Sequence, residues 1–248
     1  MSTLIIDHPT LGPVTVTERK GSGKISARWK EGRLRINIPA GATRRQMEQA
    51  IERHREDFER IRPRPRYTVG TVIPIAGAPD STASSGRHFE IRIESTPKEE
   101  MDILLQTEGQ LTIFHILVPQ RLDIGSPDIQ KRINGCVKTA ARRLAPPILL
   151  HRARQLASRL GLRVDRWEIA HGQNVLGTCY PRQRRIRLSY INIFLTPELR
   201  DYIILHELAH LTEAGHTPAF HALCDSYCRG RESTLINQLH SFSWPVER

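Results

Sequence analysis

Short apolar stretches separated by glycine-bearing turns begin the chain, and this pattern predicts β-strands. Four strands are expected at residues 4–6, 14–18, 25–29 and 34–38, arranged as an antiparallel meander. After residues 39–42 the apolar positions change to helical spacing, at Met47, Ile51, Phe58 and Ile61. Thr43 and Gln46 form a capping-box signature ahead of this stripe. We therefore expect a helix from Thr43 to about Ile61 that packs its apolar side on the strands.

A second set of strands is expected at residues 67–74, 89–94, 101–106 and 111–118. Residues 77–86, between the first two of these strands, are rich in Ser, Gly and Ala, which predicts a mobile segment. Residues 119–127 interrupt the strand pattern and lead into helical spacing. We place a domain boundary there, which divides the chain into a β-rich domain, residues 1–122, and a second domain, residues 123–248.

The second half of the chain mixes helices with a small sheet. One helix is expected to end or kink at Pro146 and Pro147, and another to span residues 148–160. Period-two spacing predicts strands at residues 164–169, 175–179 and 185–190, with a hairpin turn at 180–183. Thr196 and Thr217, each followed by proline, predict the N-caps of two further helices. The chain is therefore expected to be α+β, with an antiparallel small sheet in its C-terminal domain.

One of these helices contains the pattern HExxH at residues 206–210. His206 and His210 are four residues apart, so they lie on one side of a helix and their imidazoles can bind one metal ion. Glu207 lies beside them, where a carboxylate can take a proton from a water molecule on that ion. This arrangement indicates metal-assisted hydrolysis.

A third ligand is needed to complete a catalytic site with one position left for water. His216 follows His210 by six residues, and Gly215 is expected to end the helix so that His216 can return to the ion. Glu213 is the alternative, because it lies on the same helical face as the first two histidines. An oxyanion stabiliser is also expected, with Tyr202, Tyr180 or an arginine of the hairpin as candidates.

The chain of 248 residues is basic, with 37 Lys and Arg against 26 Asp and Glu and a formal charge of +11. A basic surface favours polyanions such as nucleic acid or nucleotide phosphates. Two places concentrate this charge, namely the extended segment 62–66 and the hairpin that carries Arg182, Arg184, Arg185 and Arg187. The hairpin edge beside the HExxH helix is also a place where an extended peptide can be held by main-chain hydrogen bonds.

The location of the protein is expected to be cytoplasmic. No stretch of the sequence is long and apolar enough to span a bilayer, and its start lacks the pattern of a signal peptide. The four cysteines show no disulfide framework, so reduced thiols are expected. Cys224 and Cys228 are interpreted as small buried residues on one face of a helix.

Several motifs of the C-terminal half together resemble a known family. The order Gly177-Thr178-Cys179, basic hairpin, Thr196-Pro197-Glu198, HELAHL and His216-Thr217-Pro218-Ala219-Phe220 is similar to that of the YgjP-like, SprT-related metallopeptidases of the zincin group. The resemblance extends over the whole chain and is strongest at residues 164–227. Two positions depart from the family: Leu176-Gly177-Thr178-Cys179 replaces Trp-Gly-Ser-Cys, and Gly215 replaces an Asn.

The resemblance implies a zincin-like C-terminal domain in which Zn²⁺ is bound by His206, His210 and His216, with Glu207 as the general base. The main hypothesis is a zinc-dependent metallopeptidase. Two alternatives keep the site but change the partner: a UTP pyrophosphatase, an activity also given to YgjP-like members, and a nucleic-acid-associated SprT-like protein. The expected partners are a peptide, protein or nucleotide substrate and a polyanion at the Arg-rich surface, with no membrane. The absence of a Gly-rich phosphate loop or a nucleic-acid-binding motif favours the peptidase.

Overall fold

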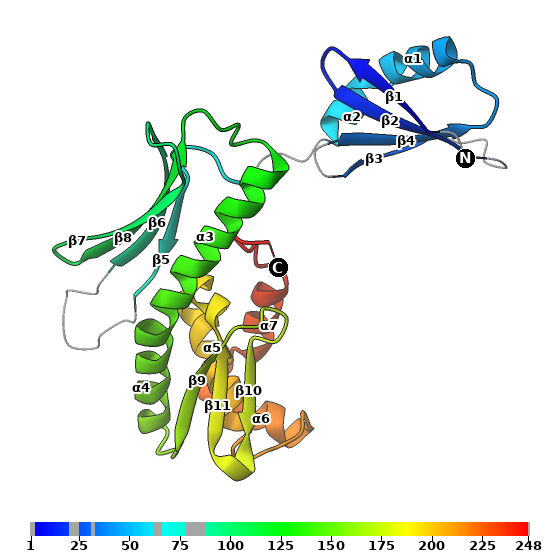
Figure 1. Ribbon diagram of the computed structural model, residues 1–248. Helices are drawn as coiled ribbons and strands as arrows, with labels where there is room; N and C mark the ends of the chain where they lie inside the picture. The colour runs from blue at the N-terminus through cyan, green and yellow to red at the C-terminus, as the bar shows by residue number, and fades with distance from the viewer. Residues whose placement is uncertain (1–2, 20–24, 31–32, 62–65, 78–87, 248) are drawn as a thin grey trace. The chain divides into compact units, whose positions relative to one another are not determined.

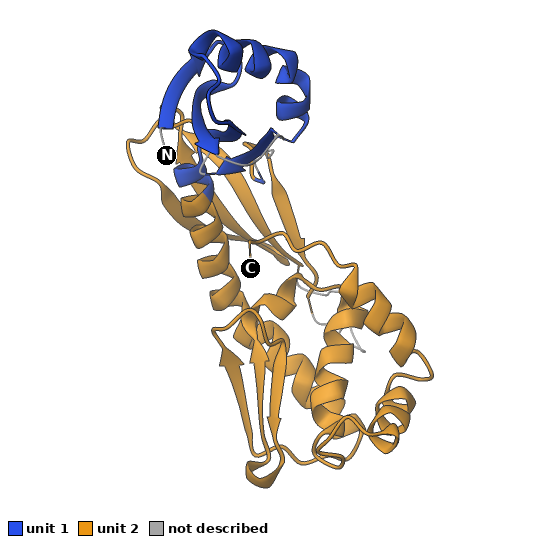
Figure 2. Ribbon diagram, turned by 90° about the vertical axis from the view of Figure 1, so that its right-hand side faces the viewer, with its two compact units in different colours: residues 1–66, 125–130 blue, residues 67–124, 131–248 orange. Residues whose placement is uncertain are grey.

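The computed structural model describes residues 3–19, 25–30, 33–61, 66–77 and 88–247 (Figure 1). Packing divides the chain into two compact units, unit 1 with residues 1–66 and 125–130 and unit 2 with residues 67–124 and 131–248 (Figure 2). Residues 67–122 are grouped with the helical half of the chain, so these units do not coincide with the predicted domains 1–122 and 123–248. The predicted boundary at residue 122 stays a prediction.

Unit 1 contains a four-stranded sheet made of β1 (Thr3–His8), β2 (Gly12–Arg19), β3 (Ser26–Lys30) and β4 (Arg33–Pro39). The strand order is β1-β2-β4-β3, and β2 and β4 run parallel. The four strands were predicted, but the antiparallel meander was wrong. The reason is burial: Leu34, Ile36 and Ile38 of β4 are at most 4% exposed, so the most apolar strand lies between β2 and β3 rather than at an edge.

The helix after the first sheet is shorter than predicted. Thr43 forms the predicted capping box with Gln46, and α1 (Arg44–Arg53) follows it. The helix is interrupted at His54 and resumes as α2 (Arg55–Arg60). Phe58 is buried as expected, and its carbonyl accepts a hydrogen bond from Trp29 Nε1 at 2.8 Å, whereas Ile61 is 52% exposed and does not join the core.

Unit 2 begins with a second four-stranded sheet, made of β5 (Val72–Ile75), β6 (His88–Thr96), β7 (Asp102–Glu108) and β8 (Leu111–Pro119). Its order is β5-β6-β8-β7 with β6 and β8 parallel, which repeats the topology of the first sheet. The four predicted strands are present with shifted ends. The predicted mobile segment 77–86 lies outside the described residues except for Gly77, and residues 62–65 of the Arg-rich segment also lie outside them.

Two long helical segments follow the second sheet. The first is α3 (Pro127–Ala145), which continues through a π-helical turn (Pro146–Leu150) directly into α4 (His151–Arg159). The two prolines therefore distort the helix without ending it, because a π-turn removes the need for the regular backbone hydrogen bonds at that place. Among the described residues, no helix is both long and apolar enough to cross a membrane.

The small sheet of unit 2 lies beside the last helices. It consists of β9 (Arg166–Ala170), β10 (Gly177–Tyr180) and β11 (Arg185–Ser189) in the order β10-β11-β9. The predicted hairpin joins β10 to β11 through a 3-10 turn, Pro181–Gln183. β10 is antiparallel to β11 but β9 is parallel to it, so the sheet is mixed rather than antiparallel as predicted. The α+β fold class is confirmed.

The end of unit 2 is helical and holds the candidate site. A buried 3-10 segment (Tyr190–Phe194) leads to α5 (Pro197–Ala209), which is followed by α6 (Pro218–Tyr227) and α7 (Glu232–His240). Thr196 and Thr217 cap α5 and α6 as predicted, since their side chains accept hydrogen bonds from the third residue of each helix. Caps of this kind fix where each helix begins.

A buried arginine holds the start of α5 in place. Arg200 is 1% exposed and its guanidinium donates to three main-chain carbonyl groups, those of Ala76, Ile193 and Leu195, at 2.9–3.3 Å. Burial lowers the pKa of Arg200 to about 10, which leaves it charged at neutral pH. This one side chain therefore connects the end of β5, the 3-10 segment and the helix that bears HExxH.

Candidate metal centre

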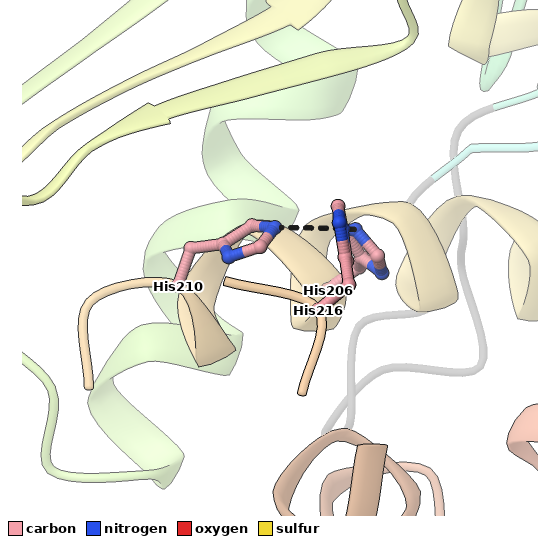
Figure 3. A group of neighbouring side chains, drawn as sticks. All are labelled: His206, His210 and His216. Atoms are coloured by element: carbon pink, nitrogen blue, oxygen red, sulfur yellow. Dashed lines mark hydrogen bonds between the residues drawn. The ribbon is translucent and has the colours of Figure 1, made fainter. Parts of the chain in front are cut away.

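Three histidines from one short region of the chain point their rings toward one another (Figure 3). His206 lies in the last turn of α5, and His210 is the C-cap of that helix, which ends at Ala209. His216 lies in the loop before α6. The helix therefore ends well before Gly215, the residue predicted to break it, and the turn at residues 210–213 already brings His216 back.

The three Nε2 atoms form a compact group. His216 Nε2 is 3.1 Å from His206 Nε2 and 3.2 Å from His210 Nε2. Ligands of a tetrahedral zinc ion with Zn–N distances of about 2.0–2.1 Å are separated by about 3.3 Å, so the spacing fits such an ion. A neutral imidazole nitrogen is either a donor or an acceptor, and His216 Nε2 cannot satisfy two other nitrogens equally well. A cation at the centre satisfies all three.

The protonation of the histidines also suits a metal. Burial and the neighbouring imidazoles lower the pKa of His206 to about 4, and burial lowers that of His210. His210 Nδ1 lies 3.0 Å from the carbonyl oxygen of Glu213, so it carries the proton and leaves the Nε2 lone pair free. Neutral imidazoles with free Nε2 atoms are the form that binds zinc.

Phe220 forms the floor of the group. Its ring is fully buried, stacks on His210 at 4.4 Å between centroids, and meets His206 and His216 edge-on, each at 4.9 Å. This ring reaches the histidines because Thr217 and Pro218 start α6 directly after His216. An apolar floor restricts the rotamers of all three imidazoles and excludes water from beneath them.

Glu207 is buried between α5 and the edge strand β10. Its side chain lies against Gly177, where an added Cβ would be only 2.6 Å from Glu207 Cγ and 2.7 Å from Cδ. The carboxylate accepts a hydrogen bond from the main-chain N–H of Cys179. Burial raises the pKa of Glu207 to about 7, and burial together with the Glu207 charge raises that of the Cys179 thiol to about 12. A carboxyl group with a pKa near neutrality can both accept and release a proton.

A family model for the YgjP-like metallopeptidase domain matches residues 24–234. The chain belongs to the YgjP-like metallopeptidase family. This confirms the resemblance seen in the sequence and places the protein among metal-dependent peptidases. No curated protein matches the chain significantly. Among solved structures, the metallopeptidase zymogen abylysin of Pyrococcus abyssi is similar over 36% of this chain and 91% of that chain, with 20% sequence identity and a TM-score of 0.29.

The sequence of this YgjP-like chain also suggested an alternative metal ligand and candidate oxyanion stabilisers, and these residues lie in different places. Glu213 contributes its carbonyl oxygen to His210, and within the described residues its carboxylate belongs to no group that could hold a metal ion. Tyr202 is 5% exposed, with its ring edge-on to His206 at 6.0 Å. Tyr180 is covered by the guanidinium of Arg185 at 4.0 Å. The oxyanion stabiliser therefore stays unassigned.

Sequence reasoning did not find the neighbours of the site. Phe220 was noted only as the last residue of the motif that resembles the family, although its position four residues after His216 was a usable signal. Cys224, His221 and Glu232 lie next to the histidines as well. Nothing in the sequence points to Glu232, because its place depends on how α7 packs on α5.

Proposed function

We propose that this member of the YgjP-like family is a zinc-dependent metallopeptidase in which His206, His210 and His216 bind Zn²⁺ and Glu207 is the general base. The observation that carries the proposal is that His216 Nε2 lies 3.1 Å from His206 Nε2 and 3.2 Å from His210 Nε2. Membership of a metallopeptidase family supports a metal-dependent peptidase. The three histidine ligands, the identity of the metal and the role of Glu207 are part of this proposal.

A zinc ion held by His206, His210 and His216 would supply a Lewis acid that acidifies a water molecule and polarises a carbonyl group. Glu207 takes the proton of the attacking water and passes it to the leaving amine, which its pKa of about 7 permits. The Cys179 N–H fixes the direction of the Glu207 carboxylate, and contact with Gly177 limits its rotation. The Phe220 ring contacts all three imidazoles and so holds the proposed ligand nitrogens in place.

The edge strand β10 is suited to hold an extended peptide. The Leu176 carbonyl accepts a hydrogen bond from Ser189 N–H, so Leu176 faces β11. Because backbone groups alternate along a strand, those of Gly177 and Cys179 point away from β11, on the side where Cys179 meets Glu207. The Cys179 N–H already donates to Glu207, so a peptide at this edge would pair with the main-chain groups of Gly177 and the carbonyl of Cys179, next to the general base. This geometry supports an unfolded or extended segment of protein as the substrate.

The hairpin arginines give less support to the other partners considered. Arg185 and Arg187 lie 3.9 and 3.4 Å from Glu168, which Arg166 of β9 also contacts, at 2.6 Å. Arg185 also covers Tyr180. Half of the hairpin arginines are therefore engaged within the fold, while Arg182 and Arg184 are exposed, so the hairpin gives only partial support to a nucleotide or nucleic acid as the partner. A cytoplasmic location stays a prediction from the sequence.

The decisive experiment is Glu207→Gln in the full chain. We expect the variant to bind one zinc ion per chain like the wild type and to lose hydrolysis of an unfolded protein substrate by about 10²–10⁴-fold, the range of general-base catalysis. Glu213→Gln is the matched control and should keep both properties. The same preparations are assayed with UTP. Turnover by Glu207→Gln contradicts the general-base role, and cleavage of UTP without cleavage of protein contradicts the peptidase.

A further inference from the structure

His206 also belongs to a second, buried group of side chains outside the three-histidine site. Nδ1 of His206 is buried and has no hydrogen-bond partner among the described residues. Cys224 Sγ and a carboxylate oxygen of Glu232 lie with His206 in a group whose ligand atoms are all within 4.8 Å of one another. Cys224 is fully buried and Glu232 is 6% exposed. A buried carboxylate beside an unpaired ring nitrogen requires an explanation.

The tautomer of His206 explains why a carboxylate lies beside its ring. If Nε2 binds a metal ion, the single proton of the neutral ring must be on Nδ1, which becomes a donor that needs an acceptor. Glu232 provides a strong acceptor, whereas the Cys224 thiol is a weak one. A ring nitrogen of His206 lies within 4.8 Å of a Glu232 carboxylate oxygen, so a side-chain shift of about 2 Å or less brings the two groups to hydrogen-bond distance.

The contacts of Glu232 hold its carboxylate in this place. Its own N–H donates to Asp225 Oδ1 at 2.9 Å, which fixes the start of α7 relative to α6. Both carboxylate oxygens lie near His221 Nδ1, at 3.1 and 3.3 Å. His221 is exposed and follows Phe220, the floor of the three-histidine site. His221 of α6 therefore holds the carboxylate, whereas the bond to Asp225 holds only the main chain at the start of α7.

The same three residues could be read as a second metal site, but the first site competes with it. His206 can serve both only by binding metal through both nitrogens, which removes the last proton of its ring. A single ion on the Nε2 side with an N–H donor on the Nδ1 side keeps the imidazole neutral. This is the arrangement in which carboxylates usually support metal-bound histidines.

We propose that Glu232 is the positioning residue of the metal centre, which accepts the Nδ1 proton of His206 and so fixes the tautomer and orientation of that ligand. This inference rests on the proposed zinc site and adds a residue from a separate helix to it. Glu232 does not touch substrate or metal. It acts through His206, and its removal weakens zinc binding without removing a ligand.

The test compares the zinc affinity of the full chain as wild type, Glu232→Gln, Glu232→Ala and Asp225→Ala, by competition with a chromogenic chelator. We expect about 10-fold weaker binding for Glu232→Gln, which retains a carbonyl acceptor, and up to about 100-fold for Glu232→Ala. Asp225→Ala removes only the bond to the main chain of Glu232, so it should lower the free energy of unfolding and leave zinc affinity within about twofold. In zinc-loaded protein, the NMR signal of the His206 Nδ1 proton should be present in the wild type and lost in Glu232→Ala.

The outcomes separate this inference from the proposed function. A Glu232→Ala protein that binds zinc as tightly as the wild type overturns the positioning role alone. Equal losses of affinity in Asp225→Ala and Glu232→Ala show a merely structural role and also overturn it. If the wild type binds two zinc ions per chain and Glu232→Ala binds one, Glu232 is a ligand of a second ion, and the positioning role is overturned. A wild-type chain that binds no zinc overturns the metal centre and this inference together.

Discussion

Gly177 and Glu207 are in such close contact that no side chain fits at residue 177. An added Cβ would lie 2.6 Å from Glu207 Cγ and 2.7 Å from Cδ, closer than Cβ atoms approach in folded proteins. Gly177 has no positive φ, so its role is space and not backbone conformation. The glycine of the edge strand thus determines where the proposed general base lies.

Gly177→Ala should displace the Glu207 carboxylate and leave the three histidines in place. We expect peptide hydrolysis to fall by about 100-fold, the effect of a misplacement of about 1 Å, with zinc content unchanged. Zinc analysis and a protease assay on the same sample measure both. Gly172→Ala is the control, because an added Cβ there meets nothing within 4 Å. Full activity of Gly177→Ala would show that Glu207 tolerates the shift and argue against its tight placement.

The metal-free protein should be destabilised by Glu207 at alkaline pH. The folded-state pKa of about 7 is above the ordinary value of 4.5, so the folded protein binds the extra proton between these two values. The free energy of unfolding therefore falls as pH rises through this window, and the destabilisation by Glu207 is complete above pH 7. Glu207→Gln should be more stable than the wild type by about 2–3 kcal/mol at pH 8, with the difference disappearing near pH 4.

Urea denaturation in the presence of a chelator measures this difference. Glu213→Gln, which changes a less buried carboxyl group in the same region, should give no comparable gain. A gain in Glu207→Gln that is the same at pH 4 and pH 8 would show that ionisation is not its cause.

Phe220 should matter for stability as well as for the site, because its ring is fully buried and contacts all three histidines. Phe220→Ala should lower the free energy of unfolding of the metal-free protein by about 3–5 kcal/mol. Phe242, which is only partly buried and contacts Trp244, is the matched position, and Phe242→Ala should cost less. Equal losses in the two variants would contradict the role of Phe220 as the packed floor of the histidine group.

Local patterns predicted much of this protein. Neighbouring residues were enough to predict the capping box of Thr43, the caps Thr196 and Thr217, and most strands. Helix caps and periodicity depend on a few adjacent positions. The HExxH spacing placed His206 and His210 one turn apart for the same reason. His216 followed from a short loop, and its ring indeed lies beside them. The sequence by itself therefore determined which helix carries the candidate chemistry.

Tertiary structure decided what surrounds that helix. The parallel pairing of β2 with β4 and of β9 with β11 joins segments that are not consecutive, and no local pattern encodes it. The contact of Gly177 with Glu207 spans thirty residues, and Glu232 reaches His206 only because α7 packs on α5. Such contacts depend on the free energy of packing the whole core, to which distant residues contribute jointly. The sequence thus placed the proposed ligands and the proposed base, and the fold alone selected the groups that surround them.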